Sequence, residues 1–530
     1  METLEKNLRR IVGDEFVLVE PAAREFYSAD LSLEEAEVAK FVVQPGTADE
    51  LAKVVKTVTD AKHALSVRGG GTSYTPCFAP RRDNTVLLDL HRLNRIVEIS
   101  CSDRYVVVES GCTWQALNEA VGKVGLRVPH IGPVSGRWAT IGGTVAQNGI
   151  SLGSGKEGTI AESVLGVEVV LADGRLLRTG SWGHREGRPY HRYFGPDLTG
   201  LFIGDSGAFG IKTRISLRLV DVPKPVLCLS AGFDAMEPMV RAQTEIARRG
   251  LAADSYGFDP VRNASIGKYT VSPREGLATL ARVAVHQGLR AAFTSVRAGR
   301  SFLSGVAYSL HMSFEGTGAE ATRKQALAIC RQHNGIKIPE VVPTALRADT
   351  FGGLEHVLLG PDGEVWVAVH CCVPLSEAVA MVRRVQDCFN ERQNRLEQNG
   401  ISASFFTSHA RNVFFIEPVF WWKDRIDPLR RHFVGAPATA RWADREENIS
   451  ARQEVRAICA ALRDRFARHG GHFIQPGCYY PYSGNLSDTA TGDVLSVIKD
   501  SLDPQRLISP MALGFGGARL PDHRQGGKRL

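Results

Sequence analysis

TIGGTVAQNGISLGS, residues 140–154, is the stretch around which the rest of the chain is interpreted. Four of its fifteen residues are glycine, and Gln147 and Asn148 are its only large polar residues. Glycine fills no core, but it lets backbone amides approach a ligand closely, and oriented amides bind phosphate oxygens. A second glycine cluster, RGGGTS, occupies residues 68–73. Two such loops predict one large cofactor that carries phosphate.

The composition is that of a globular protein with more than one hydrophobic core. The chain has 530 residues, of which 43% are hydrophobic and 23% charged, and a single core rarely serves such a length. The net charge of +7 is scattered, which disfavours nucleic-acid binding. No apolar run approaches the about 18 residues of a membrane span, and the first sixteen residues lack the apolar core of a signal peptide.

The ten cysteines include no C-x-x-C pair. They are therefore expected to be reduced, and a structural metal site is disfavoured. Together with the absence of a signal peptide, this predicts a cytoplasmic protein.

The N-terminal region reads as alternating strands and helices. Phe41–Pro45 is typical of a short buried strand, and 47–62 has helical spacing of apolar residues with Thr47 as the N-cap. A strand at 65–67 then leads directly into the RGGGTS loop. This unit would place the loop at the end of a sheet.

The composition changes near Pro223 to Pro225, which we take as a domain boundary. Beyond it, strand-like runs at 305–313 and 364–373 are each followed by a helical pattern, at 319–333 and 376–394. Repeated strand–helix units with antiparallel strands between them indicate an α+β plate. Further strands are expected at 164–171, closed by a hairpin turn, and at 412–418.

Four motifs in a fixed order carry a family resemblance. They are RGGGTS at 68–73, ATIGGTVAQNG at 139–149, ESVLGVEVVLADG at 162–174 and DLTGLFIGDSGAFGI at 197–211. Together the four motifs resemble the FAD-binding domain of the vanillyl-alcohol oxidase/p-cresol methylhydroxylase (PCMH) superfamily, and within it the glycolate oxidase and D-lactate dehydrogenase branch. The likeness is strong over about residues 35–225 and looser at DPQRLISP, residues 503–510.

The resemblance implies a fold and a division into domains. The fold class is α+β, with a PCMH-type FAD-binding domain of two subdomains and an α+β cap, or substrate, domain whose mostly antiparallel sheet is covered by helices. The FAD-binding domain would span 1–225 and the cap domain 226–465. Residues 466–530 would return to the FAD-binding domain.

The resemblance also assigns FAD as the cofactor and names residues that hold it. Thr72 stands where tethering members carry histidine, so FAD is expected to be non-covalent at this position. The sequence GSGKE at 153–157 is not a P-loop, because its glycine spacing is wrong and Glu157 replaces the magnesium-binding hydroxyl. The implied cofactor-binding residues are Arg68, Gly69, Gly70, Gly71, Thr72, Ser73, Tyr74, Pro133, Thr140, Gly142, Gly143, Thr144, Asn148, Gly149, Gly210 and Ile211.

The candidates for the substrate side are His409, Arg411, His472, Tyr480 and Tyr482. Oxidation of an alcohol needs a base near the hydroxyl proton, and histidine has a suitable pKa. The alternative for each histidine is an ordinary core or surface residue whose hydrogen bonds are satisfied. The Arg411 guanidinium can form a bidentate ion pair with a carboxylate. The tyrosine hydroxyls can orient a substrate oxygen. The aromatic run from Phe414 to Trp422 reads as core filler or as the wall of a pocket.

Two departures from relatives narrow the chemistry. The H-x-G-D-G-N-x-H metal motif of many D-2-hydroxyacid dehydrogenases is missing, and Tyr480 precedes proline where phenol-oxidising relatives carry arginine. We therefore expect no metal, and dehydrogenation of an alcohol or 2-hydroxy acid by hydride transfer to the flavin N5. The alternatives are oxidation of a para-substituted phenolic substrate and a non-redox transfer of the alkylglycerone-phosphate synthase type.

The expected partners follow from this interpretation. They are a small-molecule substrate and an electron acceptor, for which oxygen, a cytochrome and a quinone stay open. A homodimer is the assembly considered, with no nucleic acid and no membrane span.

Overall fold

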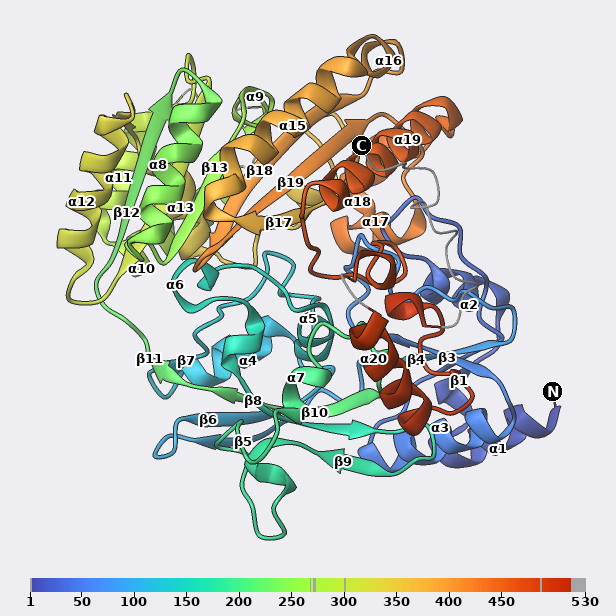
Figure 1. The fold of residues 1–530 in the computed structure, drawn as a ribbon. Coiled ribbons are helices and arrows are strands. Elements are labelled where there is room, and N and C mark those ends of the chain that lie inside the picture. Colours follow the sequence, from blue (N-terminus) through green and yellow to red (C-terminus); the bar gives the residue numbers. More distant parts are fainter. Residues whose placement is uncertain (1, 267, 270–272, 300–301, 487–488, 516–530) are drawn as a thin grey trace.

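The structure is a computed structural model that describes residues 2–266, 268–269, 273–299, 302–486 and 489–515. It contains both helices and antiparallel sheets, which confirms the α+β class. One half of the molecule, blue to cyan-green in Figure 1, is built on small sheets. The other half, green to orange, is built on one large sheet that packs above it. Below they are called the lower half and the cap.

The lower half begins with a four-stranded sheet in the order β1-β2-β4-β3. The strands are Val17–Leu18, Phe41–Val43, Ala64–Arg68 and Thr85–Asp89 in chain order, and β2, β4 and β3 run parallel. Helix α3, Ala48–Asp60, connects β2 to β3 and buries four of its apolar residues. The Thr47 side chain accepts a hydrogen bond from the Glu50 amide at 3.1 Å. The predicted strand–helix–strand unit is confirmed, and it delivers the RGGGTS loop at the end of β3.

A five-stranded antiparallel sheet completes the lower half, in the order β5-β6-β10-β8-β9. Gly174, with φ +83°, forms the predicted turn between β8 and β9. The elements are β5 Ile96–Ser100, β6 Tyr105–Glu109, β8 Val164–Val170, β9 Leu176–Arg178 and β10 Ile211–Arg218, with helices α4 Trp114–Gly122 and α5 Ile141–Gln147.

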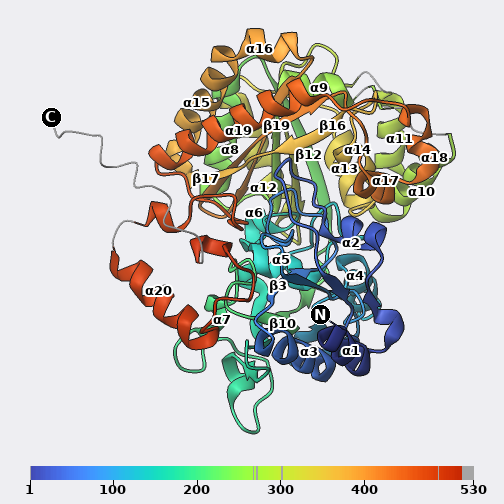
Figure 2. The same cartoon turned by 90° about the vertical axis from the view of Figure 1, so that its right-hand side faces the viewer.

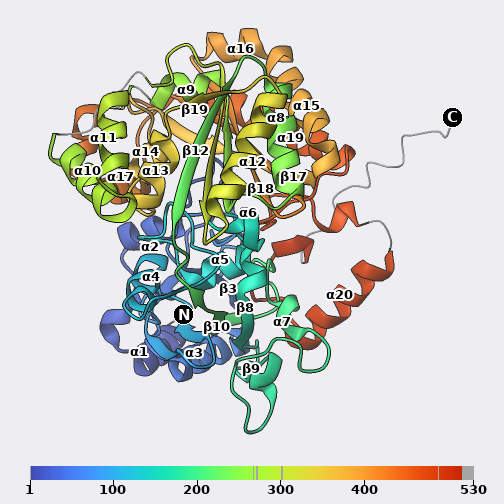
Figure 3. The ribbon, with the colours of Figure 1, turned by 90° about the vertical axis from the view of Figure 1, so that its left-hand side faces the viewer.

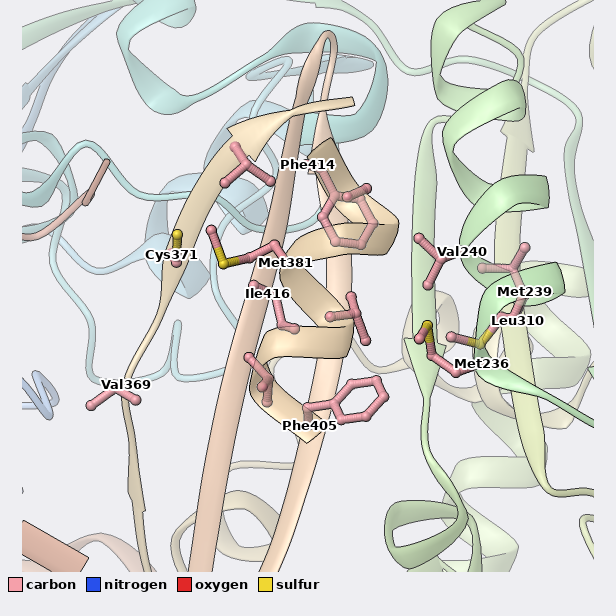
Figure 4. Close-up of a cluster of buried hydrophobic side chains, with 14 of the residues drawn as sticks. Met236, Met239, Val240, Leu310, Val369, Cys371, Met381, Phe405, Phe414 and Ile416 are labelled. Atoms are coloured by element: carbon pink, nitrogen blue, oxygen red, sulfur yellow. The ribbon is translucent and has the colours of Figure 1, made fainter. Parts of the chain in front are cut away.

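The cap is an eight-stranded antiparallel sheet, in the order β15-β12-β14-β13-β18-β19-β16, with β17 also paired to β19. Four helices cover one face, and Figure 4 shows part of the core between them, with Met239, Met381, Phe405 and Phe414. The strands are β12 Val226–Phe233, β13 Asp254–Phe258, β14 Tyr308–Glu315, β15 Ile336–Ile338, β16 Val365–Ala368, β17 Cys371–Pro374, β18 Ser402–Ala410 and β19 Val413–Trp422, and the helices are α8 Met236–Arg248, α12 Ala319–Gln332, α15 Ala378–Glu391 and α19 Ile449–Arg468.

The cap departs from the sequence expectation at one strand that matters for the site. The run 364–373 was expected as a single strand, but it divides into β16 and β17 at Val369 and His370. Opposite this break lies Pro418 of β19, which has no amide hydrogen to donate to the ladder. The Val369 amide still donates to the Pro418 carbonyl at 3.0 Å, while the His370 amide donates out of the ladder to the Tyr480 hydroxyl at 2.9 Å. Strand β18 was not predicted, because polar residues interrupt its apolar pattern.

The C-terminal segment returns to the lower half. The amide of Leu65 in β3 donates to the Leu507 carbonyl, and the Ser509 amide donates to the Leu65 carbonyl. Helix α20, Thr489–Leu502, runs beside the lower half in Figure 2. The remaining elements are α1 Glu2–Val12, α2 Pro21–Ser28, α6 Ser154–Glu157, α7 Leu198–Leu201, α9 Pro260–Ile266, α10 Pro273–Gln287, α11 Leu289–Ala298, α13 Val341–Ala348, α14 Glu355–Leu358, α16 Gln393–Gln398, α17 Pro428–Val434, α18 Ala436–Thr439, β7 Leu126–Arg127 and β11 Val220–Asp221.

None of the helices in the described part of the chain combines the length and the hydrophobicity that crossing a bilayer requires.

Candidate functional site

The two glycine loops of the lower half pack directly against each other. A Cβ atom on Gly70 would lie 1.8 Å from the Trp138 carbonyl oxygen, and one on Gly69 would lie 2.3 Å from Thr140 Oγ1. Both distances are far inside van der Waals contact, so only glycine fits at these two positions. Part of the glycine content of residues 68–71 therefore serves the contact between the loops themselves.

The RGGGTS loop also presents backbone donors. Within the described part of the chain, no group accepts a hydrogen bond from the amides of residues 69–73. Gly71, with φ +70°, bends the backbone in this segment. Successive free amides at the end of a parallel strand form a concavity for anionic oxygen, and such donors require a partner. The loop therefore fits the pyrophosphate of a dinucleotide cofactor.

The other glycine stretch, residues 140–154, contributes side-chain oxygens rather than glycine amides. The Gly142 amide donates to the Ser110 carbonyl at 2.8 Å, and the Gly143 amide to Thr140 Oγ1 at 3.3 Å. Three buried side-chain atoms nearby, Ser110 Oγ, Gln147 Oε1 and Asn148 Oδ1, lack a hydrogen-bond partner among the described residues. These unpartnered atoms suit a polar ligand beside α5.

Asn148 occupies a left-handed conformation, with φ 48°, at the C-terminal end of α5. Gly149, next in the chain, packs against Thr144. Of the other cofactor candidates, Thr72, Ser73 and Pro133 are half-buried. Gly210 and Ile211 lie against Val169 and Val170 of β8, and a Cβ on Gly210 would meet Val169 at 2.5 Å.

Arg68 anchors the RGGGTS loop to neighbouring parts of the protein. Its Nη1 donates to the Tyr27 carbonyl at 2.8 Å, and its guanidinium stacks on Phe26, Tyr27 and Phe78. The side chain is 4% exposed. Its contacts are thus with the protein, and in this structure it anchors the start of the loop to the C-terminal end of α2.

The uncovered face of the cap sheet lies opposite these loops. Ala368 pairs with Val419 and Cys371 with Ile416, so the register places His370 directly opposite Glu417. Side chains at directly opposite positions share one face of a sheet, with Cβ atoms about 5 Å apart.

This face carries aromatic side chains and touches the lower half at several points. Trp366, Phe415 and Trp421 lie on it. Three residues from outside the cap pack on it, namely Tyr74 after the RGGGTS loop, Ile150 within the 140–154 stretch and Ile474 of the C-terminal segment.

Glu417 is the ionisable centre of this face. The Tyr74 hydroxyl donates a short hydrogen bond to Glu417 Oε1. Burial raises the pKa of the Glu417 carboxyl to about 7, and the hydrogen bond from Tyr74 and the positive charge of Arg262 oppose this rise. A carboxyl group with such a pKa changes protonation near neutral pH, which is what a general base requires.

Arg262 of α9 supplies the positive charge near Glu417. Its guanidinium lies over the Trp421 ring, 5.8 Å from the centroid, and over the Phe258 ring at 5.9 Å. Its Nη1 is buried and has no hydrogen-bond partner among the described residues. A buried guanidinium nitrogen without an acceptor is costly, and a carboxylate ligand would satisfy it.

His370 and Tyr480 form a closed pair. His370 Nε2 lies 2.5 Å from the Ile474 carbonyl, which can only accept, so Nε2 carries the proton and Nδ1 is the acceptor. The Tyr480 hydroxyl lies 3.1 Å from that Nδ1 and also accepts from the His370 amide. Burial lowers the pKa of His370 to about 4, so the ring is neutral. Both hydrogen-bonding roles of the Tyr480 hydroxyl are thereby used within the protein.

The other substrate-side candidates are dispersed. His409 is 1% exposed at the end of β18, near Gly155 of α6 and Asp254, and neither ring nitrogen has a partner among the described residues. His472 pairs with Cys372 through its backbone. Arg411 is exposed in the β18–β19 turn, with its guanidinium 3.6 Å from Glu162.

Tyr482 is half-buried and packs on the core of the lower half. Of the five substrate-side residues predicted from the sequence, the structure thus brings Tyr480 into direct contact with the Glu417 face. Glu417, His370 and Arg262 were not among the site residues predicted from the sequence. A single carboxylate within the otherwise apolar run of β19 was the signal that could have identified Glu417.

The fold and the site together define a class. An amide cradle at the end of a parallel strand, joined to an antiparallel cap sheet, suits a protein that binds a phosphate-bearing cofactor. Residues 39–180 match the family model described as an FAD binding domain. This part of the chain is therefore similar to an FAD-binding domain.

Sequence relatives include the probable mitochondrial D-lactate dehydrogenase of Danio rerio and the glycolate oxidase subunit GlcD of Bacillus subtilis. The first is 30% identical over 47% of this chain and 49% of the relative, and the second is 29% identical over 46% and 50%. The match thus spans about half the length of these curated relatives.

Solved structures show a likeness of the fold over nearly the whole chain. The 4-ethylphenol oxidase from Gulosibacter chungangensis matches with a TM-score of 0.72 at 16% identity, over 98% of both chains. p-Cresol methylhydroxylase matches with a TM-score of 0.68 at 17% identity, over 97% of both. The fold of the described chain, including the cap, is therefore that of these two proteins.

Proposed function

We propose that this protein is an FAD-dependent oxidoreductase that dehydrogenates the CH–OH group of an alcohol or 2-hydroxy acid. The single observation that carries the proposal is the half-buried Glu417 carboxyl. It is hydrogen-bonded to the tyrosine that immediately follows the phosphate-binding loop, and its pKa is about 7. The sequence relatives named as D-lactate dehydrogenase and glycolate oxidase support the same reaction class.

Bound FAD supplies a hydride acceptor at N5. Glu417, when ionised, accepts the proton of the substrate hydroxyl and so favours departure of the hydride from the same carbon. Tyr74 keeps the carboxylate oriented through its hydroxyl. The neutral His370 and Tyr480 pair fixes the C-terminal segment against the sheet beside Glu417. His409 and His472 remain alternative bases.

Arg262 favours a substrate that is an acid. Its partnerless Nη1 and its position over Trp421 offer one guanidinium edge to a carboxylate. We therefore propose 2-hydroxy acids as the first substrate class. Replacing Arg262 by glutamine should raise KM for a 2-hydroxy acid about tenfold to hundredfold, the cost of about 1.5–3 kcal/mol for a hydrogen bond to a charged group. KM for an uncharged alcohol should not change, and an equal rise for both would refute the assignment.

Anaerobic titration of the purified flavoprotein tests the function itself. Glycolate, D-lactate, L-lactate and 4-hydroxybenzyl alcohol are added in turn and the flavin absorbance is followed, after which air is admitted. We expect a 2-hydroxy acid to bleach the flavin. Protein that carries no flavin, or flavin that no alcohol bleaches, would refute the proposal, and the second outcome would direct attention to a non-redox transfer.

Oxidation of a phenolic substrate is the second candidate. Trp366, Phe415 and Trp421 give the Glu417 face an aromatic surface that suits a ring. Bleaching by the phenolic alcohol alone would favour this candidate over the first.

The proposal also includes how FAD is bound, the electron acceptor, the assembly and the compartment. We propose non-covalent FAD at Thr72, which acid precipitation tests, because non-covalent flavin stays in the supernatant. Oxygen, a cytochrome and a quinone are retained as acceptors, and the admission of air separates oxygen from the others. A homodimer and the cytoplasm are proposed as assembly and compartment.

A further inference from the structure

Helices α10 and α11 form a hairpin at the outer edge of the cap, joined by Gly288 (Figure 3). On α10, Leu277, Ala281 and Val285 follow each other at four-residue spacing, and all three are exposed. On α11, Leu289, Phe293 and Val296 follow at spacings of four and three residues, and all three are exposed. Such spacing places each set on one face of its helix. Each helix thus presents an apolar face to solvent.

Four of these side chains are among the five most exposed large apolar residues in the described chain. Val285 and Leu289 are each 80% exposed, and Leu277 and Phe293 are each 68% exposed. Elsewhere, only Val497 on α20 reaches 68%. Single exposed apolar residues are normal on a protein surface, whereas a cluster of them marks an interaction site.

The inner side of the hairpin is already packed. Val283 of α10 is 2% exposed, and the Arg282 guanidinium pairs with Asp349 at the end of α13. The hairpin is therefore held on the cap, and the apolar faces that remain are those directed outward.

This segment is strongly basic. Residues 268–300 contain six Lys and Arg residues and one acidic residue, Glu275. The whole chain has a net charge of only +7, so this short segment carries most of the excess. Apolar helix faces flanked by Lys and Arg are the combination that binds anionic lipid headgroups.

We propose that the α10–α11 hairpin is a docking surface for an anionic phospholipid membrane, with the apolar faces in the headgroup layer and the exposed Arg297 beside lipid phosphates. A second copy of the chain is a poorer occupant, because a two-fold contact would bring two segments of the same positive charge together. The protein would lie on the bilayer rather than cross it.

The test uses the flavin-loaded protein and sedimentation with vesicles. One set of vesicles contains equal parts of phosphatidylglycerol and phosphatidylcholine, and the other contains phosphatidylcholine alone. We expect binding to the anionic vesicles, at least tenfold weaker binding to the neutral ones, and a loss of binding when salt rises from 0.1 to 0.5 M.

The variant pair Leu289→Glu with Phe293→Glu should weaken binding to anionic vesicles at least tenfold, and Arg297→Glu should weaken it less. Val497→Glu on α20 is the matched control, because its side chain is as exposed as Phe293, and it should bind as the unmodified protein does. Flavin content and the thermal midpoint verify that each variant is folded.

Three outcomes overturn the proposal. They are the absence of vesicle binding, an equal loss of binding in the Val497 control, and a concentration-dependent dimer in light scattering that the Leu289 and Phe293 changes abolish. The last outcome would assign the surface to a second copy of the chain. Vesicle binding does not depend on turnover, so this test stands apart from that of the proposed reaction.

Discussion

The glycine loops of the lower half and the Glu417 face of the cap sheet lie on opposite sides of one candidate site, but they are built differently. The loops offer backbone amides from one continuous segment, residues 69–73. The sheet face offers side chains from β19, from the break between β16 and β17, and from α9. The proposed cofactor contacts are therefore local in the chain, whereas the proposed reacting groups depend on strand register. The first three predictions below perturb one side and leave the other intact, and the last perturbs neither.

The largest effect on cofactor binding is expected on the loop side, from Gly70→Ala. The added Cβ would collide with the Trp138 carbonyl oxygen, and such overpacking costs about 1–3 kcal/mol. FAD affinity should fall about tenfold to hundredfold, measured as flavin content and by titration of the apoprotein. Gly122→Ala at the end of α4 is the control, because nothing lies within 4 Å of its added Cβ, and it should keep its flavin.

On the sheet side, Glu417→Gln should leave FAD bound and slow its reduction. Loss of a general base typically costs about 10²–10⁴ in rate. Stopped-flow reduction of the bound flavin measures the change, with Glu162→Gln as a control carboxylate that is exposed. A Glu417 variant that reduces its flavin at the unmodified rate would return the role of base to His409 or His472.

The pH dependence sharpens the assignment of Glu417. Since burial raises the pKa of this carboxyl to about 7, the rate of flavin reduction should rise about tenfold per pH unit below 7 and level off above it. The Gln variant should lack this inflection. The same group binds its proton more tightly in the folded state, so its contribution to the free energy of unfolding falls as pH rises from about 4.5 to 7. Thermal midpoints of both proteins across this range measure that difference.

The smallest effect is expected from Thr47→Ala, which touches neither side of the site. Loss of the hydrogen bond from the Glu50 amide should cost about 1 kcal/mol of stability. The thermal midpoint should decrease by about 2 °C, with FAD affinity unchanged. Thr57→Ala within α3 is the control, because alanine favours a helix interior, and it should not decrease the midpoint. A loss of flavin in the Thr47 variant would mean that α3 affects the loop more directly than the contacts indicate.

The sequence by itself determined the α+β class, the strand–helix–strand unit before the RGGGTS loop, and the cofactor class. These features are local. A glycine run after a buried strand already specifies free amides, because no distant residue has to supply them. The ordered motifs between 68 and 211 then restricted the fold.

Only the tertiary structure decided which side chains face the loops. Pro418 removes a ladder donor and splits the expected strand at His370, and the register of β19 places Glu417 opposite that break. Tyr74 reaches Glu417 across 343 residues of sequence, and Arg411 lies in an exposed turn while Arg262 lies near Glu417. A shift of register by one residue would turn Glu417 into the core. Because register and domain packing are set by contacts between distant segments, no local pattern in this chain could have selected Glu417, His370 and Arg262 together.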